Sequence, residues 1–147
     1  MSQNVFSAES AENMEAIEQQ FAVKAVKQMD TYWNLLTAIP GSKLKLTNQD
    51  DKIYESFMKH FPEFKDPAKI AKIDEEEMKS KTGKERWRKF MKEFEDVADY
   101  NFGTMLRTDA GQEYTQEGTI FAVRMQFYAV EIARNKYGLN DWICQKK

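Results

Sequence analysis

Few residues of this sequence could carry out catalysis, and each of them has a simpler structural explanation. The single histidine, His60, and the single cysteine, Cys144, lie far apart in the chain, and such a pair would act only if folding brought the two side chains together. We interpret His60 as a residue near a helix end and place Cys144 in a C-terminal tail. The acids from Asp74 to Glu77 are typical of a first helical turn, where the helix dipole favours negative charge.

Motifs that bind cofactors are missing from the sequence. No glycine-rich loop follows an expected strand, so both nucleotide-binding fingerprints are lacking. One cysteine cannot form an intramolecular disulfide or a multi-cysteine metal site, which favours a reducing compartment. We therefore expect no catalytic residue, no metal and no cofactor, and a binding protein rather than an enzyme.

A basic run offers binding chemistry instead. Residues 79–92 contain seven basic side chains and a single acid, Glu85. Lys84, Arg88 and Lys92 are four residues apart, so a helix would place them on one face, where like charges disfavour the helix by about 0.2–0.5 kcal/mol per pair. We predict that these three side chains contact an anionic partner such as RNA or an acidic protein surface. The alternative is a solvated face with compensating pairs, such as Glu85 with Lys89.

A second set of polar side chains interrupts an apolar segment near the C-terminus. Arg124 and Glu131 are seven residues apart, and Arg134 and Asn135 follow within about one turn. Charged groups in a buried helix are costly unless they are paired or face a groove. Two interpretations stay open: a structural network in which Arg124 and Arg134 share Glu131, or a polar groove that binds a partner together with Arg107. All five residues are candidate partner-binding residues.

The elements that would position these residues are mainly helices. From about Ser10, apolar residues recur at steps of three and four and predict the buried face of a long first helix: Met14, Ile17, Phe21, Ala25, Met29, Tyr32, Leu36 and Ile39. Helix starts are predicted from N-cap signals and a capping box, at Thr47, Asp66, Asp74 and Thr82.

The last helix is predicted to run from about Thr115 to Tyr137 and to end at Gly138 in the left-handed conformation. Because its apolar residues cover nearly its whole circumference, we expect it at the centre of the fold. Alternation at residues 43–47 and a segment at residues 104–108 predict a small two-stranded β element.

Length and composition indicate one domain. The chain has 147 residues, 41% of them hydrophobic, and a formal net charge of -2, which permits a sizeable core and argues against an overall basic field. The expected fold is mainly α, a single-domain helical bundle around a central C-terminal helix. We expect a flexible N-terminus at residues 1–10, the domain at residues 11–140 and a tail at residues 141–147. With no recognisable signal peptide or membrane span, a cytoplasmic location is expected.

Several segments carry a family resemblance that covers roughly residues 16–140. It is carried by Tyr100–Arg107, Tyr114–Thr115 and Thr119–Phe121, and its most specific part is the block from Arg124 to Asn135. In these blocks the sequence resembles the polysaccharide biosynthesis domain-containing protein family, in particular its short eukaryotic members.

The resemblance implies a function that the family name does not describe. Short eukaryotic members are understood as cytosolic chaperones that assist co-translational folding of translation elongation factor 1-alpha by binding its nascent GTPase domain. The implied partners are this nascent factor, the nascent polypeptide-associated complex and the ribosome, with no membrane and no DNA. The alternative is a ribosome- or RNA-associated adaptor that acts through the basic helix face. An enzyme of carbohydrate or methyl transfer is a third hypothesis, which the missing glycine-rich loop disfavours.

Overall fold

The computed structural model describes the backbone of residues 8–145 and the side chains of residues 23–144. In chain order the helices before the sheet are α1 (Ala8–Ala38), α2 (Asp50–His60), α3 (Pro67–Ala71), α4 (Glu75–Met78) and α5 (Lys81–Met91), with 3-10 turns at Gly41–Lys43, Pro62–Lys65 and Lys92–Phe94. Strands β1 (Gly103–Arg107) and β2 (Thr119–Val123) follow, and then helices α6 (Arg124–Lys136) and α7 (Asp141–Gln145). The fold is a mainly helical single domain with a small antiparallel sheet, as predicted.

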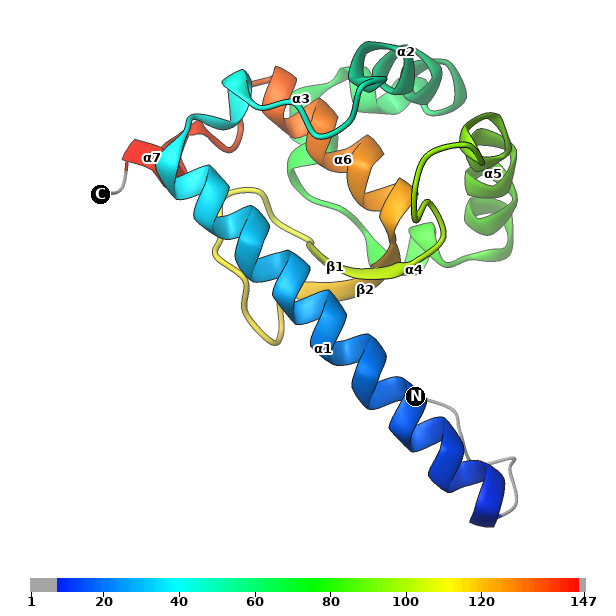
Figure 1. The fold of residues 1–147 in the computed structure, drawn as a ribbon. Helices are drawn as coiled ribbons and strands as arrows, with labels where there is room; N and C mark the ends of the chain where they lie inside the picture. Colours follow the sequence, from blue (N-terminus) through cyan, green and yellow to red (C-terminus); the bar gives the residue numbers. More distant parts are fainter. Residues whose placement is uncertain (1–7, 146–147) are drawn as a thin grey trace.

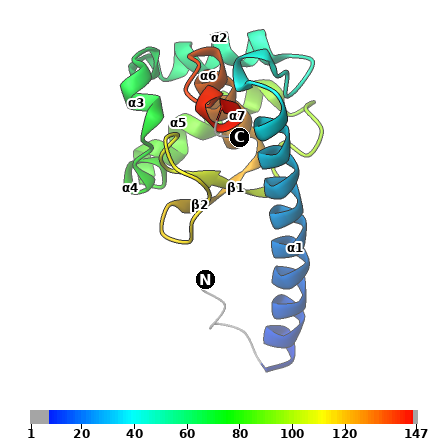
Figure 2. The ribbon, with the colours of Figure 1, turned by 90° about the vertical axis from the view of Figure 1, so that its left-hand side faces the viewer.

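Helix α6 is the central element of the fold (Figures 1 and 2). Every residue from Ala129 to Asn135 is buried, and α6 contacts α2, α3, α5 and both strands. Helix α1 packs along β1 and α7, while its N-terminal turns extend beyond the rest of the domain. The prediction of a central C-terminal helix is therefore confirmed.

The start of the last helix was predicted wrongly. Residues 119–123 form strand β2 instead, and they pair with β1 in a register that places Gly103 opposite Val123 and Arg107 opposite Thr119. Ile120 and Ala122 are buried while Phe121 is exposed, which is the alternation of a strand. The partner of β1 was also predicted wrongly, because residues 43–47 form no strand and lie between a 3-10 turn and α2.

Two helix caps differ from the prediction and two agree with it. Helix α5 begins after Ser80, whose hydroxyl accepts a hydrogen bond from the Gly83 backbone N–H, so the capping box at Thr82 is not used. Helix α2 follows Gln49 rather than Thr47. The predicted caps Asp66 and Asp74 each accept backbone N–H donors in the first turn of their helix, and Gly138 is left-handed with φ 74°.

The two ends of the chain differ in how they compare with the prediction. Residues 1–7 lie outside the described residues, as do the side chains of Met14, Ile17 and Phe21 that were assigned to the apolar face of α1. Residues 141–145 form helix α7 rather than a tail, and Ile143 in this helix is buried. Packing against α1 holds α7 in place.

An aromatic cluster fixes α5 against the rest of the domain. The ring centroids of Phe61 and Trp87 are 4.5 Å apart, and Phe57 lies 5.4 Å from Trp87 and 5.7 Å from Phe90. Aromatic pairs at such distances contribute beyond their buried area. With Trp87 and Phe90 facing inward, the opposite face of α5 is left to solvent.

Candidate functional site

Four of the five predicted partner-binding side chains lie inside the protein. Arg107, Glu131 and Arg134 are 0% exposed and Asn135 is 4% exposed. Arg107 stands at the end of β1, and the other three belong to α6. A buried charge is tolerated when it is paired and hydrogen-bonded, so the arrangement around these side chains decides their role.

Glu131 is the centre of this buried network. Its Oε1 accepts hydrogen bonds from the Tyr32 hydroxyl at 2.6 Å, from Asn140 Nδ2 at 2.9 Å and from Arg107 Nη2 at 3.3 Å. Its Oε2 accepts a hydrogen bond from Arg134 Nη1 at 2.8 Å. The carboxylate therefore joins α1, β1, α6 and the segment before α7 at one point.

The two arginines extend the network to backbone carbonyls. Arg107 Nη1 donates to the carbonyl oxygens of Ala110 and Gln112, each at 3.0 Å. Arg134 Nε donates to the carbonyl oxygen of Ile70 at 2.9 Å, and its Nη1 donates to that of Arg107 at 2.8 Å. These bonds hold the loop after β1 and the end of α3 against the central helix.

The two arginines also set the protonation of Glu131. Burial acts to raise the pKa of this carboxyl, but the charges of Arg107 and Arg134 together with the Tyr32 hydroxyl outweigh burial and hold the pKa below its usual range. The opposite holds for Tyr32, since burial and the neighbouring Glu131 carboxylate raise its pKa. Glu131 is thus an anion that accepts hydrogen bonds from a neutral tyrosine.

Arg124 is not a member of the network. It is the first residue of α6, about 10 Å along the helix axis from Glu131, and its Nη1 reaches the Tyr128 hydroxyl at 3.4 Å. The predicted sharing of Glu131 by Arg124 and Arg134 is therefore wrong for Arg124, and Arg107 takes its place. The groove expected at Arg107, Arg124 and Glu131 is not formed, because Arg107 and Glu131 are buried and paired with each other while Arg124 lies apart from them.

Two members of the network escaped the sequence analysis. Tyr32 had been assigned to the apolar face of α1, and Asn140 had no role assigned. Asn140 Nδ2 also donates to Asn135 Oδ1 at 2.7 Å, and Tyr32 lies 99 residues before Glu131. No local spacing signals the contact of Tyr32, and Asn140 lies beyond the left-handed Gly138, where helical spacing no longer applies.

The predicted basic face is exposed and lines an open groove. Lys84, Arg88 and Lys92 are exposed, and all three border a groove of about 520 Å³ between α5 and the end of β2. Its floor is largely apolar, with contributions from Trp87, Met91, Tyr100 and Val123. We call this feature the basic groove.

Backbone contacts hold the far wall of the basic groove in place. The carbonyl oxygens of Tyr100 and Phe102 accept hydrogen bonds from the N–H groups of Met125 and Arg124, at 2.8 and 2.7 Å. These donors belong to the first turn of α6, where no partner exists within the helix. The loop that bears Tyr100 is thereby held against the central helix and forms the wall of the groove opposite α5.

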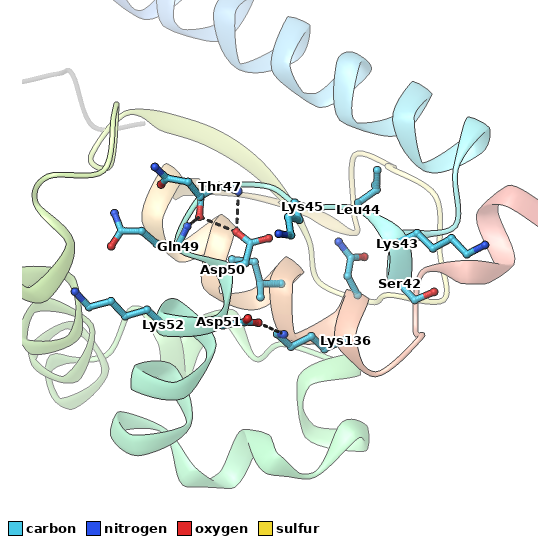
Figure 3. A pocket seen from close by; sticks show the side chains of 13 residues that line it. Ser42, Lys43, Leu44, Lys45, Thr47, Gln49, Asp50, Asp51, Lys52 and Lys136 are labelled. Carbon is cyan, nitrogen blue, oxygen red and sulfur yellow. Dashed lines mark hydrogen bonds and ion pairs between the residues drawn. The ribbon is translucent and has the colours of Figure 1, made fainter.

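A second hollow, of about 490 Å³, lies between the 42–49 loop, the start of α2 and the end of α6 (Figure 3). Its lining includes four lysines and two aspartates: Lys43, Lys45, Asp50, Asp51, Lys52 and Lys136. Asp51 and Lys136 form an ion pair at 2.7 Å, which lowers the pKa of Asp51. Asp50 holds the loop, because its carboxylate accepts hydrogen bonds from the backbone N–H groups of Leu46 and Thr47.

Replacing Asp50 with alanine is expected to lower the free energy of unfolding by about 1–2 kcal/mol, as the loss of a capping carboxylate does. Hydrogen exchange at the amides of Leu46 and Thr47 should become faster, because both would lose their acceptor. Urea unfolding and exchange measured by NMR would check this. Asp51→Ala is the matched control, since Asp51 is exposed and its loss should leave both amides protected; equal exchange rates in the two variants would contradict the role given to Asp50.

The remaining chemical candidates have structural surroundings. His60 Nε2 lies 2.7 Å from Glu93 Oε2 at the end of α2, and this contact lowers the pKa of Glu93. Cys144 is half-buried in α7. Among the described residues, no three histidine, cysteine or acidic side chains are placed to hold a metal ion. Within the described part of the chain, no helix combines the length and apolar character needed to cross a bilayer.

Fold and site define a mainly helical domain built around a buried ionic network, with a basic groove on its surface. The chain belongs to the PBDC1 protein family, whose model matches residues 17–145. A Saccharomyces cerevisiae relative, Protein PBDC1 homolog, is 62% identical over 98% of this chain and 99% of its own length. Human Protein PBDC1 is 44% identical over 90% of this chain and 56% of its own length.

A solved structure agrees with the fold. The solution NMR structure of protein yst0336 from Saccharomyces cerevisiae is 62% identical in sequence, and it superposes with a TM-score of 0.86. The superposition covers 97% of this chain and 99% of that one. The helical domain and its small sheet are thus shared with an experimental structure.

These comparisons correct the resemblance drawn from the sequence. The family is PBDC1, for which polysaccharide biosynthesis domain-containing is a longer name. The names of the family and of the relatives above mention no elongation factor and no chaperone. The chaperone type that was attached to the resemblance therefore does not follow from family membership, and any such function has to be argued from the surface of the protein.

Proposed function

We propose that this protein is a cytoplasmic chaperone that binds an incompletely folded client segment in the basic groove, the client being the nascent GTPase domain of translation elongation factor 1-alpha. One observation carries the proposal: the groove combines an apolar floor with a rim of exposed cations, Lys84, Arg88 and Lys92. Client segments that are not yet folded expose apolar side chains, and a partly apolar groove can cover them.

The groove suits an adaptable contact. Met91 is half-buried in its floor, and a methionine side chain can repack against differently shaped apolar groups. Release follows from differential affinity, because the folded client no longer presents the apolar segment and its affinity for the groove falls. The nascent polypeptide-associated complex and the ribosome would then act as neighbours that bring the nascent client to this protein.

Site-specific crosslinking in a translating lysate tests the proposal. A photoreactive residue at Asn101, which is exposed and lines the basic groove, should capture nascent elongation factor chains that include the GTPase domain. The same probe at Glu55, exposed on α2 and away from the groove, is the control. Depletion of the protein should leave newly made elongation factor aggregated. If Asn101 and Glu55 capture the same chains, or solubility is unchanged on depletion, the proposal fails.

The same three cations favour one alternative, a ribosome- or RNA-associated adaptor. Contacts between cations and phosphates release counterions, so such an association would weaken steeply with salt. Sedimentation with ribosomes at rising salt, with and without reversal of the three charges, would separate the two functions. An association that depends on the charges and persists without a nascent client would support the adaptor.

A further inference from the structure

We propose that the basic groove recognises an acidic amphipathic helix, a client segment with carboxylates on one edge and apolar side chains on the next. This inference rests on the proposed function, since it specifies the chemistry of what the groove binds. It uses the spacing of the rim charges, their lack of partners and the shape of the apolar floor.

The rim charges stand in a line with helical spacing. Lys84, Arg88 and Lys92 follow one another every four residues, and four residues of α-helix rise about 6 Å. Among the described residues, the side chains of Lys84, Arg88 and Lys92 form no ion pair and no hydrogen bond. The side chains of Lys79, Arg86 and Lys136, by contrast, each form an ion pair. Unpaired like charges at this spacing disfavour the helix that bears them, and a partner with carboxylates at the same spacing would neutralise them.

The apolar floor continues beyond the rim. Val123 lines the groove, and Phe121, which points to the same face of β2, is 46% exposed. Phe102 on the adjoining loop is 43% exposed. Exposed aromatic side chains beside an apolar groove mark an interaction surface. A helix that lays its apolar side on this surface would bring its acidic edge to the three cations, which is the helix-in-groove mode of recognition.

The same observations favour a peptide over RNA. Trp87 is 4% exposed, so its ring contributes little open surface to the floor and offers no face on which a base could stack. Glu95 also lines the groove; a phosphate backbone, charged at every nucleotide, would meet this carboxylate, whereas an amphipathic helix can place an apolar residue there.

A binding titration with designed peptides tests the inference. The probe is a fluorescent peptide of about 18 residues, a length that would span the face of α5, with glutamates every four residues along one edge and leucines along the next. Its affinity for the full chain is measured by anisotropy. A peptide of the same composition in scrambled order, and one with lysine in place of each glutamate, are the controls. The ordered acidic peptide is expected to bind at least about tenfold more tightly than either control, and more weakly as salt rises.

Matched variants of the protein locate the binding. The triple variant Lys84→Glu, Arg88→Glu and Lys92→Glu should weaken binding of the acidic peptide by about tenfold or more. Phe121→Ser should weaken it without changing the charge. The control variant reverses three exposed lysines that do not line the groove: Lys65→Glu, Lys81→Glu and Lys89→Glu. Because both triples have the same net charge, a loss shared by the two would show nonspecific attraction and overturn the inference.

The outcomes for the inference and for the proposed function are distinguishable. If nascent elongation factor crosslinks at Asn101 but the ordered and scrambled peptides bind alike, the chaperone proposal stands and the acidic-helix inference falls. If the ordered peptide binds at the groove but no nascent chain is captured, the recognition chemistry stands without that client. A single-stranded RNA that binds the groove more tightly than the peptide would overturn the inference in favour of RNA.

Discussion

The Glu131→Gln variant is expected to lose about 3–5 kcal/mol of unfolding free energy, the usual cost of removing one partner from a buried ion pair. The substitution keeps the size of the side chain but leaves Arg107 and Arg134 buried without a counter-charge. Urea unfolding at neutral pH measures the loss. The control is Glu55→Gln, an exposed position on α2 where we expect a change within about 0.5 kcal/mol.

The contribution of Glu131 to the unfolding free energy is expected to depend on pH with a definite sign. The pKa of Glu131 is lower in the folded protein than the value of about 4.3 in an unfolded chain. The stability it contributes is therefore complete above about pH 4.3 and is lost as pH falls through the folded pKa, because only the unfolded chain takes up the proton. The gap between wild type and Glu131→Gln should narrow on acidification, by at most about 1.4 kcal/mol per pH unit.

Either of two results would contradict this account of the network. One is a Glu131→Gln variant as stable as the Glu55→Gln control. The other is a gap between wild type and variant that stays constant from neutral pH down to the acid transition. Binding of client or peptide by the folded variant should be unchanged, because the network is internal and does not line the basic groove. A selective loss of binding would return Glu131 to the role of a partner contact.

The second large effect is expected at Gly83, in the first turn of α5. A Cβ atom at this position would lie 2.1 Å from the Glu77 carbonyl oxygen and 2.8 Å from that of Met78, and both are backbone atoms of α4 that cannot move aside alone. Gly83→Ala should therefore lower the unfolding free energy by about 3 kcal/mol, the upper end of the usual range for overpacking. Thermal or urea unfolding would measure the change.

Gly111→Ala provides the matched control. A Cβ there meets only the Asp109 carboxylate, at 3.3 Å, so the change should stay within about 0.5 kcal/mol. The Gly83→Ala variant should also bind the acidic peptide more weakly, because the first turn of α5 carries Lys84. Equal stabilities for Gly83→Ala and Gly111→Ala would show that α4 and α5 separate readily, contrary to the close contact described.

The predictable part of the fold depends on local patterns. The helical periodicity before Ile39, the acids after Asp74 and the glycine at position 138 each act within one or two turns, and the structure agrees with all three. The basic face was found for the same reason, since a four-residue spacing alone brings Lys84 and Arg88 together. The presence of these helices and the exposure of the basic face of α5 could thus be predicted from residues that are close in the sequence.

The missed part depends on contacts between distant segments. The segment 119–123 became a strand because β1 offered a partner, although its apolar residues also fit a helix. Glu131 became an interior anion because Tyr32, Arg107 and Asn140 converge on it from three other elements. A charged residue in an apolar helix indicates that some partner must exist, but spacing along the helix pointed to Arg124, which lies too far away.

The amino-acid order was sufficient for a mainly helical domain, a central C-terminal helix and a cationic stripe on one helix, because each follows from propensity and periodicity over a few residues. Packing alone determined that the polar residues of α6 are enclosed and that the cationic stripe borders an apolar groove. The physical reason is that burial and pairing of charges depend on the sum of contacts from remote segments, which no local pattern contains.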